Sequence, residues 1–128
     1  MMALCLTAGA LAATLALQGF TLAWTHSIEK TRWEEGWRIA DGRLQLVAAR
    51  IRGSGAGMEP PADAVLRDGV WHYRPQVAPQ TRLRLAHTPY TAGYELCDGG
   101  GCRPLAEHLP GLPASAEIEL APCPPAVR

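Results

Sequence analysis

His26 and Glu35 are the two residues of this sequence whose types and spacing best suit joint chemistry. They lie in the stretch 24–37, which gathers three of the four tryptophans, one histidine and three carboxylates. A histidine and a carboxylate can act as general acid and base, or can recognise a polar ligand. In alternating strands each falls on the face otherwise given to Trp and Ile, where an unpaired polar group is costly to bury. We expect them to bond to each other or to a nearby hydroxyl, as a core pair that fixes strand register or as a site.

A glycine-rich loop at 53–57 is a second candidate. Its consecutive backbone N–H groups could hold an anion, although it lacks the Gly-Lys-Ser/Thr ending of a phosphate-binding loop. A tight loop across the end of the sheet is the alternative interpretation. Catalytic residues, metal ligands and cofactors are not predicted. The candidate binding residues are His26, Ser27, Glu29, Glu35, Gly53, Ser54, Gly55 and Gly57.

Cys97 and Cys102 flank the turn 98–101, and this spacing predicts a disulfide across a hairpin. Half of a zinc site is the alternative, with His108 and Cys123 as the plausible remaining ligands. If Cys97 pairs with Cys102, Cys123 is left over, although it could instead be the true partner of one of them.

Period-two alternation predicts strands over 20–28 and 33–39. Asp41-Gly42 then predicts a tight hairpin turn. In the following strand, 43–52, the alternation slips by one residue near Val47, which predicts a β-bulge.

Further Gly-containing turns at Asp68-Gly69 and 98–101 separate short alternating runs, one of which places Trp71 and Tyr73 on one face. These runs are 64–67, 70–74, 82–85, 94–97, 102–105 and 117–120. A short helix near 105–109 is an open alternative. The pattern predicts an all-β domain over 20–121, an antiparallel β-sandwich or partly closed barrel of about 7–8 strands, with a loose Pro-rich tail at 122–128.

The N-terminal segment has no charged residue before Glu29 and is almost wholly apolar from Leu4 to Leu17. Its length lies between that of a signal-peptide core, about 7–15 residues, and that of a spanning helix, about 20. We expect an apolar helix over 1–19 that serves as a signal peptide or membrane anchor, with a buried helix as the alternative. Cys5 does not lie where a lipoprotein cysteine would. The expected location is the periplasm or the extracytoplasmic face of the inner membrane.

The charges do not favour nucleic acid as a partner, because twelve Lys and Arg balance twelve Asp and Glu.

The order His26-Ser27-Ile28, then Glu35, then the loop 53–58 resembles the DUF1850 family over about Phe20 to Leu105. The signature positions by this resemblance are His26, Ser27, Glu35, Gly55 and Gly57. The resemblance implies a small exported or membrane-anchored protein, commonly encoded beside the fused permease of TAXI-type TRAP transporters. It implies no established activity.

Three functions follow as expectations. The first is a non-enzymatic extracytoplasmic module that works with a TRAP-type membrane permease in solute uptake. The second is a small hydrolase or metal-dependent enzyme that uses His26 and Glu35. The third is binding of a small anionic solute at the loop Gly53–Gly57.

Overall fold

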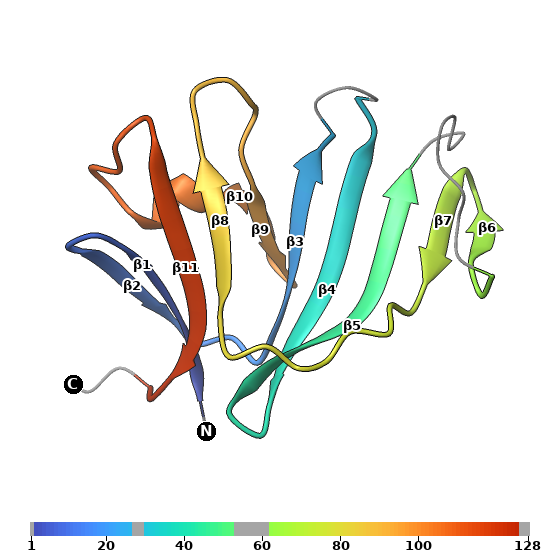
Figure 1. Ribbon diagram of the computed structural model, residues 1–128, viewed down its shortest axis with the longest axis horizontal. Coiled ribbons are helices and arrows are strands. Elements are labelled where there is room, and N and C mark those ends of the chain that lie inside the picture. Colours follow the sequence, from blue (N-terminus) through green and yellow to red (C-terminus); the bar gives the residue numbers. More distant parts are fainter. Residues whose placement is uncertain (1, 27–29, 53–61, 126–128) are drawn as a thin grey trace.

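Two antiparallel β-sheets make up the protein, and the computed structural model describes residues 2–26, 30–52 and 62–125 of it (Figure 1). The four-stranded sheet has the order β2-β1-β11-β8, and the seven-stranded sheet has the order β10-β9-β3-β4-β5-β7-β6. The predicted all-β class is confirmed, and the two sheets are compatible with the predicted sandwich. The described residues form eleven strands, rather than seven or eight, and do not close into a barrel.

The elements are β1 (Ala3–Ala8), β2 (Leu11–Leu15), β3 (Gly19–Thr25), β4 (Arg32–Ala40), β5 (Arg43–Arg52), β6 (Val65–Arg67), β7 (Val70–Tyr73), β8 (Leu83–His87), β9 (Glu95–Asp98), β10 (Gly101–Pro104), the short 3-10 helix η1 (Leu105–His108) and β11 (Ala116–Cys123).

The prediction of an N-terminal apolar helix is wrong, because this segment forms the hairpin β1–β2. Leu4 and Leu6 are fully buried on one face of β1, which lies between β2 and β11 in the four-stranded sheet. The apolar run of Leu, Ala and Thr therefore forms the buried strand β1 and the adjacent strand β2. The described stretches contain no helix long and apolar enough to cross a bilayer. A role of 1–19 as signal or anchor stays a prediction.

The two sheets share one hydrophobic core, because the inward faces of strands from both contribute to a single cluster. Leucine dominates it, as expected for a chain with one phenylalanine. The buried members of the cluster are Leu4, Leu6, Ala8, Phe20, Leu22, Trp37, Leu44, Leu46, Leu96, Leu105, Leu109, Ile118 and Leu120.

The hairpin β4–β5 forms as predicted, with Asp41 and Gly42 at φ values of 54° and 71° in its turn. The predicted bulge near Val47 is also confirmed. Gly36 pairs with Ala48 and Trp37 pairs with Leu46, which leaves Val47 as the extra residue. The bulge keeps apolar residues on the inner face of β5 on both sides of the slip.

The remaining predicted turns lie between β6 and β7 and between β9 and β10, and η1 occupies the stretch where a short helix was left open. The C-terminal strand runs as far as Cys123, into the predicted tail.

The two sheets differ in width, and this difference exposes part of the wider one. In Figure 1, β7 and β6 extend beyond the sheet formed by β2, β1, β11 and β8. The buried core cluster contains no residue of β6 or β7 among those described. In the part of the chain that the structure describes, the inner face of this end of the wide sheet therefore has no second sheet packed on it.

Candidate functional site

Glu35 lies on the inner face of the wide sheet, as its alternation predicts. In the sheet register it stands opposite Leu22 of β3 and Ala49 of β5, which are 1% and 4% exposed. Cross-strand partners share a face, so the carboxylate has apolar neighbours on both sides. Burial raises the pKa of Glu35 above its usual range, and the nearby indole N–H of Trp37 opposes part of this rise. That N–H is itself buried and makes no hydrogen bond of good geometry to any described residue.

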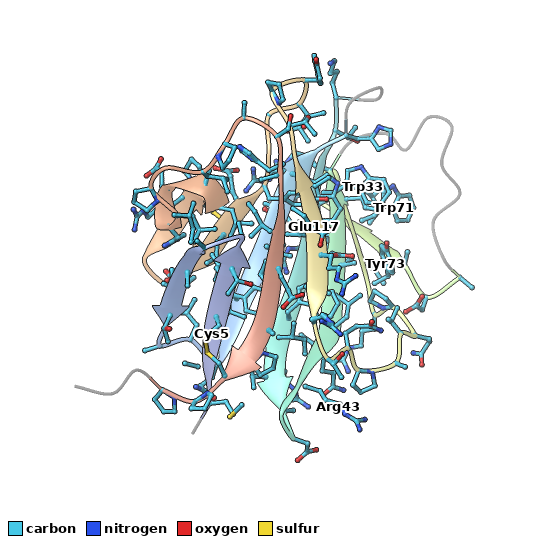
Figure 2. All side chains as sticks on the ribbon, turned by 60° about the vertical axis from the view of Figure 1, so that its left-hand side comes forward. Cys5, Trp33, Arg43, Trp71, Tyr73 and Glu117 are labelled. Carbon is cyan, nitrogen blue, oxygen red and sulfur yellow. A yellow bond between two sulfur atoms is a disulfide. The ribbon has the colours of Figure 1, made fainter. Side chains whose placement is uncertain are left out.

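Aromatic side chains occupy the next positions along the strands on the same inner face as Glu35, two residues away on β4. Trp24 and Trp33 are cross-strand partners whose rings stack at 6.2 Å, and Tyr94 lies 5.6 Å from Trp24. Ile51 lies between Trp33 and Trp71 in the same register, and Figure 2 shows both tryptophans on the same side of the molecule. We call Tyr94, Trp24, Trp33 and Trp71 the aromatic row. It crosses the wide sheet next to Glu35.

Two tyrosines also lie near Glu35. Glu35 pairs with Ala49 of β5, which in turn pairs with Tyr73 of β7, so the three side chains lie side by side on the inner face. Tyr94 belongs to the aromatic row. Burial raises the pKa of both phenols, and the negative charge of Glu35 raises both further. The two hydroxyl groups therefore lie within electrostatic reach of the same carboxylate.

His26 lies just beyond the end of β3, and its ring stacks on Trp33 at 5.9 Å. Its backbone N–H donates to the carbonyl of Thr31, and its carbonyl accepts from the N–H of Lys30. The pair Trp24–Trp33 stands between His26 and Glu35 in the register. The structure thus brings His26 to the aromatic row rather than to Glu35.

A hollow of about 300 Å³ opens beside His26, between the end of β3 and the segment that joins β8 to β9. Two rings of the aromatic row line it, together with small and hydroxyl-bearing side chains. The lining residues are Trp24, Thr25, His26, Ala86, Thr88, Thr91, Gly93 and Tyr94. Such a lining suits the contact of flat or apolar groups with a few hydrogen bonds.

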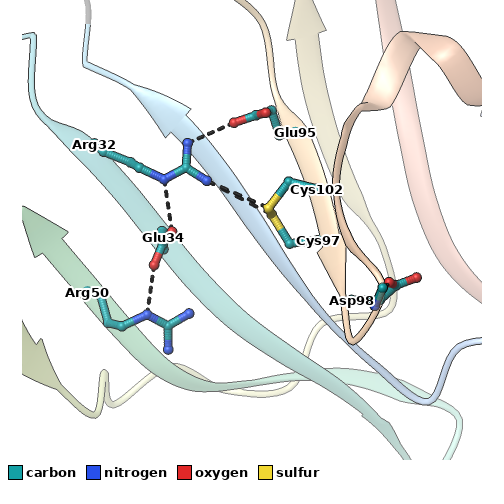
Figure 3. The surroundings of a disulfide bond; sticks show 8 residues. Arg32, Glu34, Arg50, Glu95, Cys97, Asp98 and Cys102 are labelled. Carbon is teal, nitrogen blue, oxygen red and sulfur yellow. Dashed lines mark hydrogen bonds and ion pairs between the residues drawn. A yellow bond between two sulfur atoms is a disulfide. The ribbon is translucent and has the colours of Figure 1, made fainter.

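The outer face of the wide sheet has a different chemistry. Arg32 donates to Glu34 at 2.9 Å and to Glu95 at 2.7 Å, and Arg50 donates to the other oxygen of Glu34 at 2.8 Å (Figure 3). Burial alone would raise the pKa of Glu34, but the hydrogen bonds and charges of Arg50 and Arg32 outweigh it and lower the pKa. This ion-pair network did not emerge from the sequence, because its members come from β4, β5 and β9.

The cysteines form two disulfides. Cys97–Cys102 is present as predicted, so these sulfurs are not zinc ligands, and the guanidinium of Arg32 lies against it (Figure 3). Cys123 pairs with Cys5, across a sequence separation of 118, and ties the last strand to the first. Cys5 was expected in a signal or anchor, and this pairing was missed. The two disulfides indicate an oxidising, extracytoplasmic compartment.

The six other predicted binding residues all lie outside the described residues. They are Ser27, Glu29, Gly53, Ser54, Gly55 and Gly57. Within the described part of the chain, groups of three or more His, Cys, Asp or Glu side chains that could hold a metal ion are not found.

Fold, disulfides and site together define a small extracytoplasmic β protein with an aromatic inner face. Residues 20–105 match the family described as a domain of unknown function, DUF1850, and the chain belongs to this family. The searches of curated proteins and of solved structures found no match to this chain.

Proposed function

We propose that this protein is a non-catalytic interaction module in the periplasm that works with the fused permease of a TAXI-type TRAP transporter in solute uptake. The observation that carries the proposal is the end of the wide sheet that the narrow sheet leaves uncovered. The choice of permease as partner follows from what membership of the family implies.

The strand β6 makes this end of the sheet suitable for docking. Val65 and Leu66 are 54% and 53% exposed, unusually high values for apolar residues in a sheet. β6 is hydrogen-bonded to β7 and is the last strand in the order of the described sheet. An edge of this kind can accept an extended segment of another protein as an additional strand.

The geometry gives less support to hydrolysis by His26 and Glu35. A general base must lie within hydrogen-bonding reach of the group it serves. The stacked rings of Trp24 and Trp33 stand between these two side chains in the register, which does not favour a joint acid–base role.

Mild crosslinking in native membranes, followed by affinity purification and mass spectrometry of the permease, tests the proposal. We expect the unaltered protein to recover the permease and Val65→Lys to lose most of it, because lysine on an edge strand opposes strand addition. Val77→Lys is the matched control, since Val77 is 44% exposed but lies between β7 and β8. Absence of the permease from the unaltered sample, or equal recovery with Val65→Lys, would contradict the proposal.

A further inference from the structure

We propose that Glu35 and the aromatic side chains around it form a binding site for an organic cation that carries an alkylguanidinium or alkylammonium group. This site is distinct from the edge strand β6 and does not depend on the identity of any protein partner.

The first observation is that none of the described basic side chains forms an ion pair with Glu35, although the indole N–H of Trp37 lies nearby. Among the described residues, every ion-paired arginine lies against another carboxylate, and Glu35 takes part in none of these pairs. The pairs join Arg32 to Glu34 and Glu95, Arg50 to Glu34, Arg82 to Glu119, Arg84 to Glu117 and Glu119, and Arg103 to Glu107. A partly buried carboxylate without a counter-charge is unfavourable, so an external cation would be attracted to it.

The second observation is the kind of side chain that surrounds the carboxylate. The faces of tryptophan and tyrosine rings attract cations through the negative charge of their π-systems. Trp33 lies two residues from Glu35 on the same face of β4, and Trp24 stacks on Trp33. Tyr73 and Tyr94 lie within electrostatic reach of Glu35. Rings and a carboxylate together are the arrangement that recognises an organic cation, whose apolar atoms contact the rings while its N–H groups meet the acid.

The third observation is access. Glu35, Trp33, Trp71 and Tyr73 are only partly buried. Figure 2 shows Trp33, Trp71 and Tyr73 together on one side of the molecule, toward the end of the wide sheet that carries β7. A ligand can therefore approach Glu35 from the side that the narrow sheet does not cover.

Titration calorimetry with the purified, disulfide-bonded protein tests the site directly. The probes are n-butylguanidinium and its uncharged analogue of similar shape, n-butylurea. We expect saturable binding of the cation and at least about tenfold weaker binding of the urea, a difference of about 1.4 kcal/mol. Equal binding of the two probes would overturn the proposal, because the site would then recognise shape and not charge.

Two variants locate the binding. Glu35→Gln keeps the size of the side chain and removes the charge, so butylguanidinium should bind at least about tenfold more weakly. Trp33→Leu should weaken it severalfold through the loss of the ring, and it provides a second test if the first variant does not fold. Glu34→Gln is the matched control on the opposite face and should bind as the unaltered protein does. Unchanged binding in folded Glu35→Gln would overturn the proposal.

The source of the cation is decided by a second pair of probes. N-acetylarginine amide represents an arginine side chain presented by a protein, and free arginine represents a solute. Tighter binding of the amide would assign the site to a protein side chain, and tighter binding of the free amino acid would assign it to a solute. Because these measurements use the isolated protein, their failure is separate from failure to recover the permease.

Discussion

Glu34 and Glu35 are neighbours in β4, and their carboxylates experience opposite environments. Glu34 points to the outer face, where Arg32 and Arg50 each donate to it and lower its pKa. Glu35 points to the inner face, between Leu22 and Ala49, where burial raises its pKa. Because successive side chains of a strand point to opposite faces, one peptide bond separates a carboxylate paired with two arginines from one that pairs with no described basic side chain.

This difference shows how a single strand can serve stability and recognition at once. On the outer face the charges are paired within the protein: Arg32 forms ion pairs with Glu34 and Glu95, and Arg50 forms one with Glu34. The inner face combines ring packing with a carboxylate, Glu35, that has no ion-pair partner among the described residues and only the indole N–H of Trp37 to oppose its pKa rise. We therefore expect substitutions on the outer face to change stability through ion pairs, and substitutions on the inner face to change it through packing and ligand binding.

The largest effect should come from Trp33→Ala on the inner face. Trp33 contacts the rings of both Trp24 and His26, and its indole N–H donates to the hydroxyl of Thr31 at 3.2 Å. Truncation of a fully buried aromatic residue costs about 3–5 kcal/mol, so for this half-buried ring we expect about 2–4 kcal/mol.

Denaturant unfolding, repeated at low and high salt, measures this change. The loss of stability should be similar at both salt concentrations, because ring packing is not screened. A loss below about 1 kcal/mol would mean that the aromatic row does not stabilise the inner face.

The sequence predicted those features of this comparison that depend on local pattern. Alternation along β4 placed Glu35 on the inner face, Asp41-Gly42 marked the hairpin, and the slip near Val47 marked the bulge. Each depends on a few adjacent residues, whose preferences for turns and strands act without the rest of the fold.

The sequence did not predict what distant strands bring together. The hairpin β1–β2 was expected to be a helix, because alanine and leucine suit an apolar helix as well as a buried strand. Its strand character comes from pairing with β11, more than a hundred residues away, and the disulfide Cys5–Cys123 joins the same two elements. The same limit explains why Tyr94 and Arg50 were not recognised as neighbours of the stretch 24–37.

Glu34→Gln should give the next largest effect, a loss of about 1–2 kcal/mol, because hydrogen bonds between charged groups on a partly buried face are worth more than exposed pairs. The loss should shrink in high salt, unlike that of Trp33→Ala. Thermal unfolding at pH 7 at two salt concentrations measures it. Glu107→Gln is the control, since its ion pair with Arg103 is more than half exposed and should contribute little. An equal loss in both variants would argue against the network.

Glu35→Gln should have the opposite sign at pH 7. It removes a charge that burial disfavours, so in the absence of ligand we expect a gain of about 0.5 kcal/mol, small because the side chain is only half-buried and water screens it. The same unfolding measurement compares it with Glu34→Gln. A clear loss of stability would show that Glu35 has a stabilising partner within the protein.

The pH dependence should give the smallest signal, and its sign separates the two carboxylates. The raised pKa of Glu35 means that the folded state holds this proton more tightly than the unfolded state, whose pKa is near 4.5. Its unfavourable contribution is absent below that pH and grows as pH rises from 4.5 through the folded-state pKa. Glu34 has a lowered pKa, so its favourable contribution is present above 4.5 and is lost as pH falls through the folded-state pKa.

Melting temperatures from pH 3 to 7 should therefore show Glu35→Gln rising above the unaltered protein and Glu34→Gln falling below it as pH increases. Parallel curves for the two variants would mean that the two faces of β4 do not differ electrostatically.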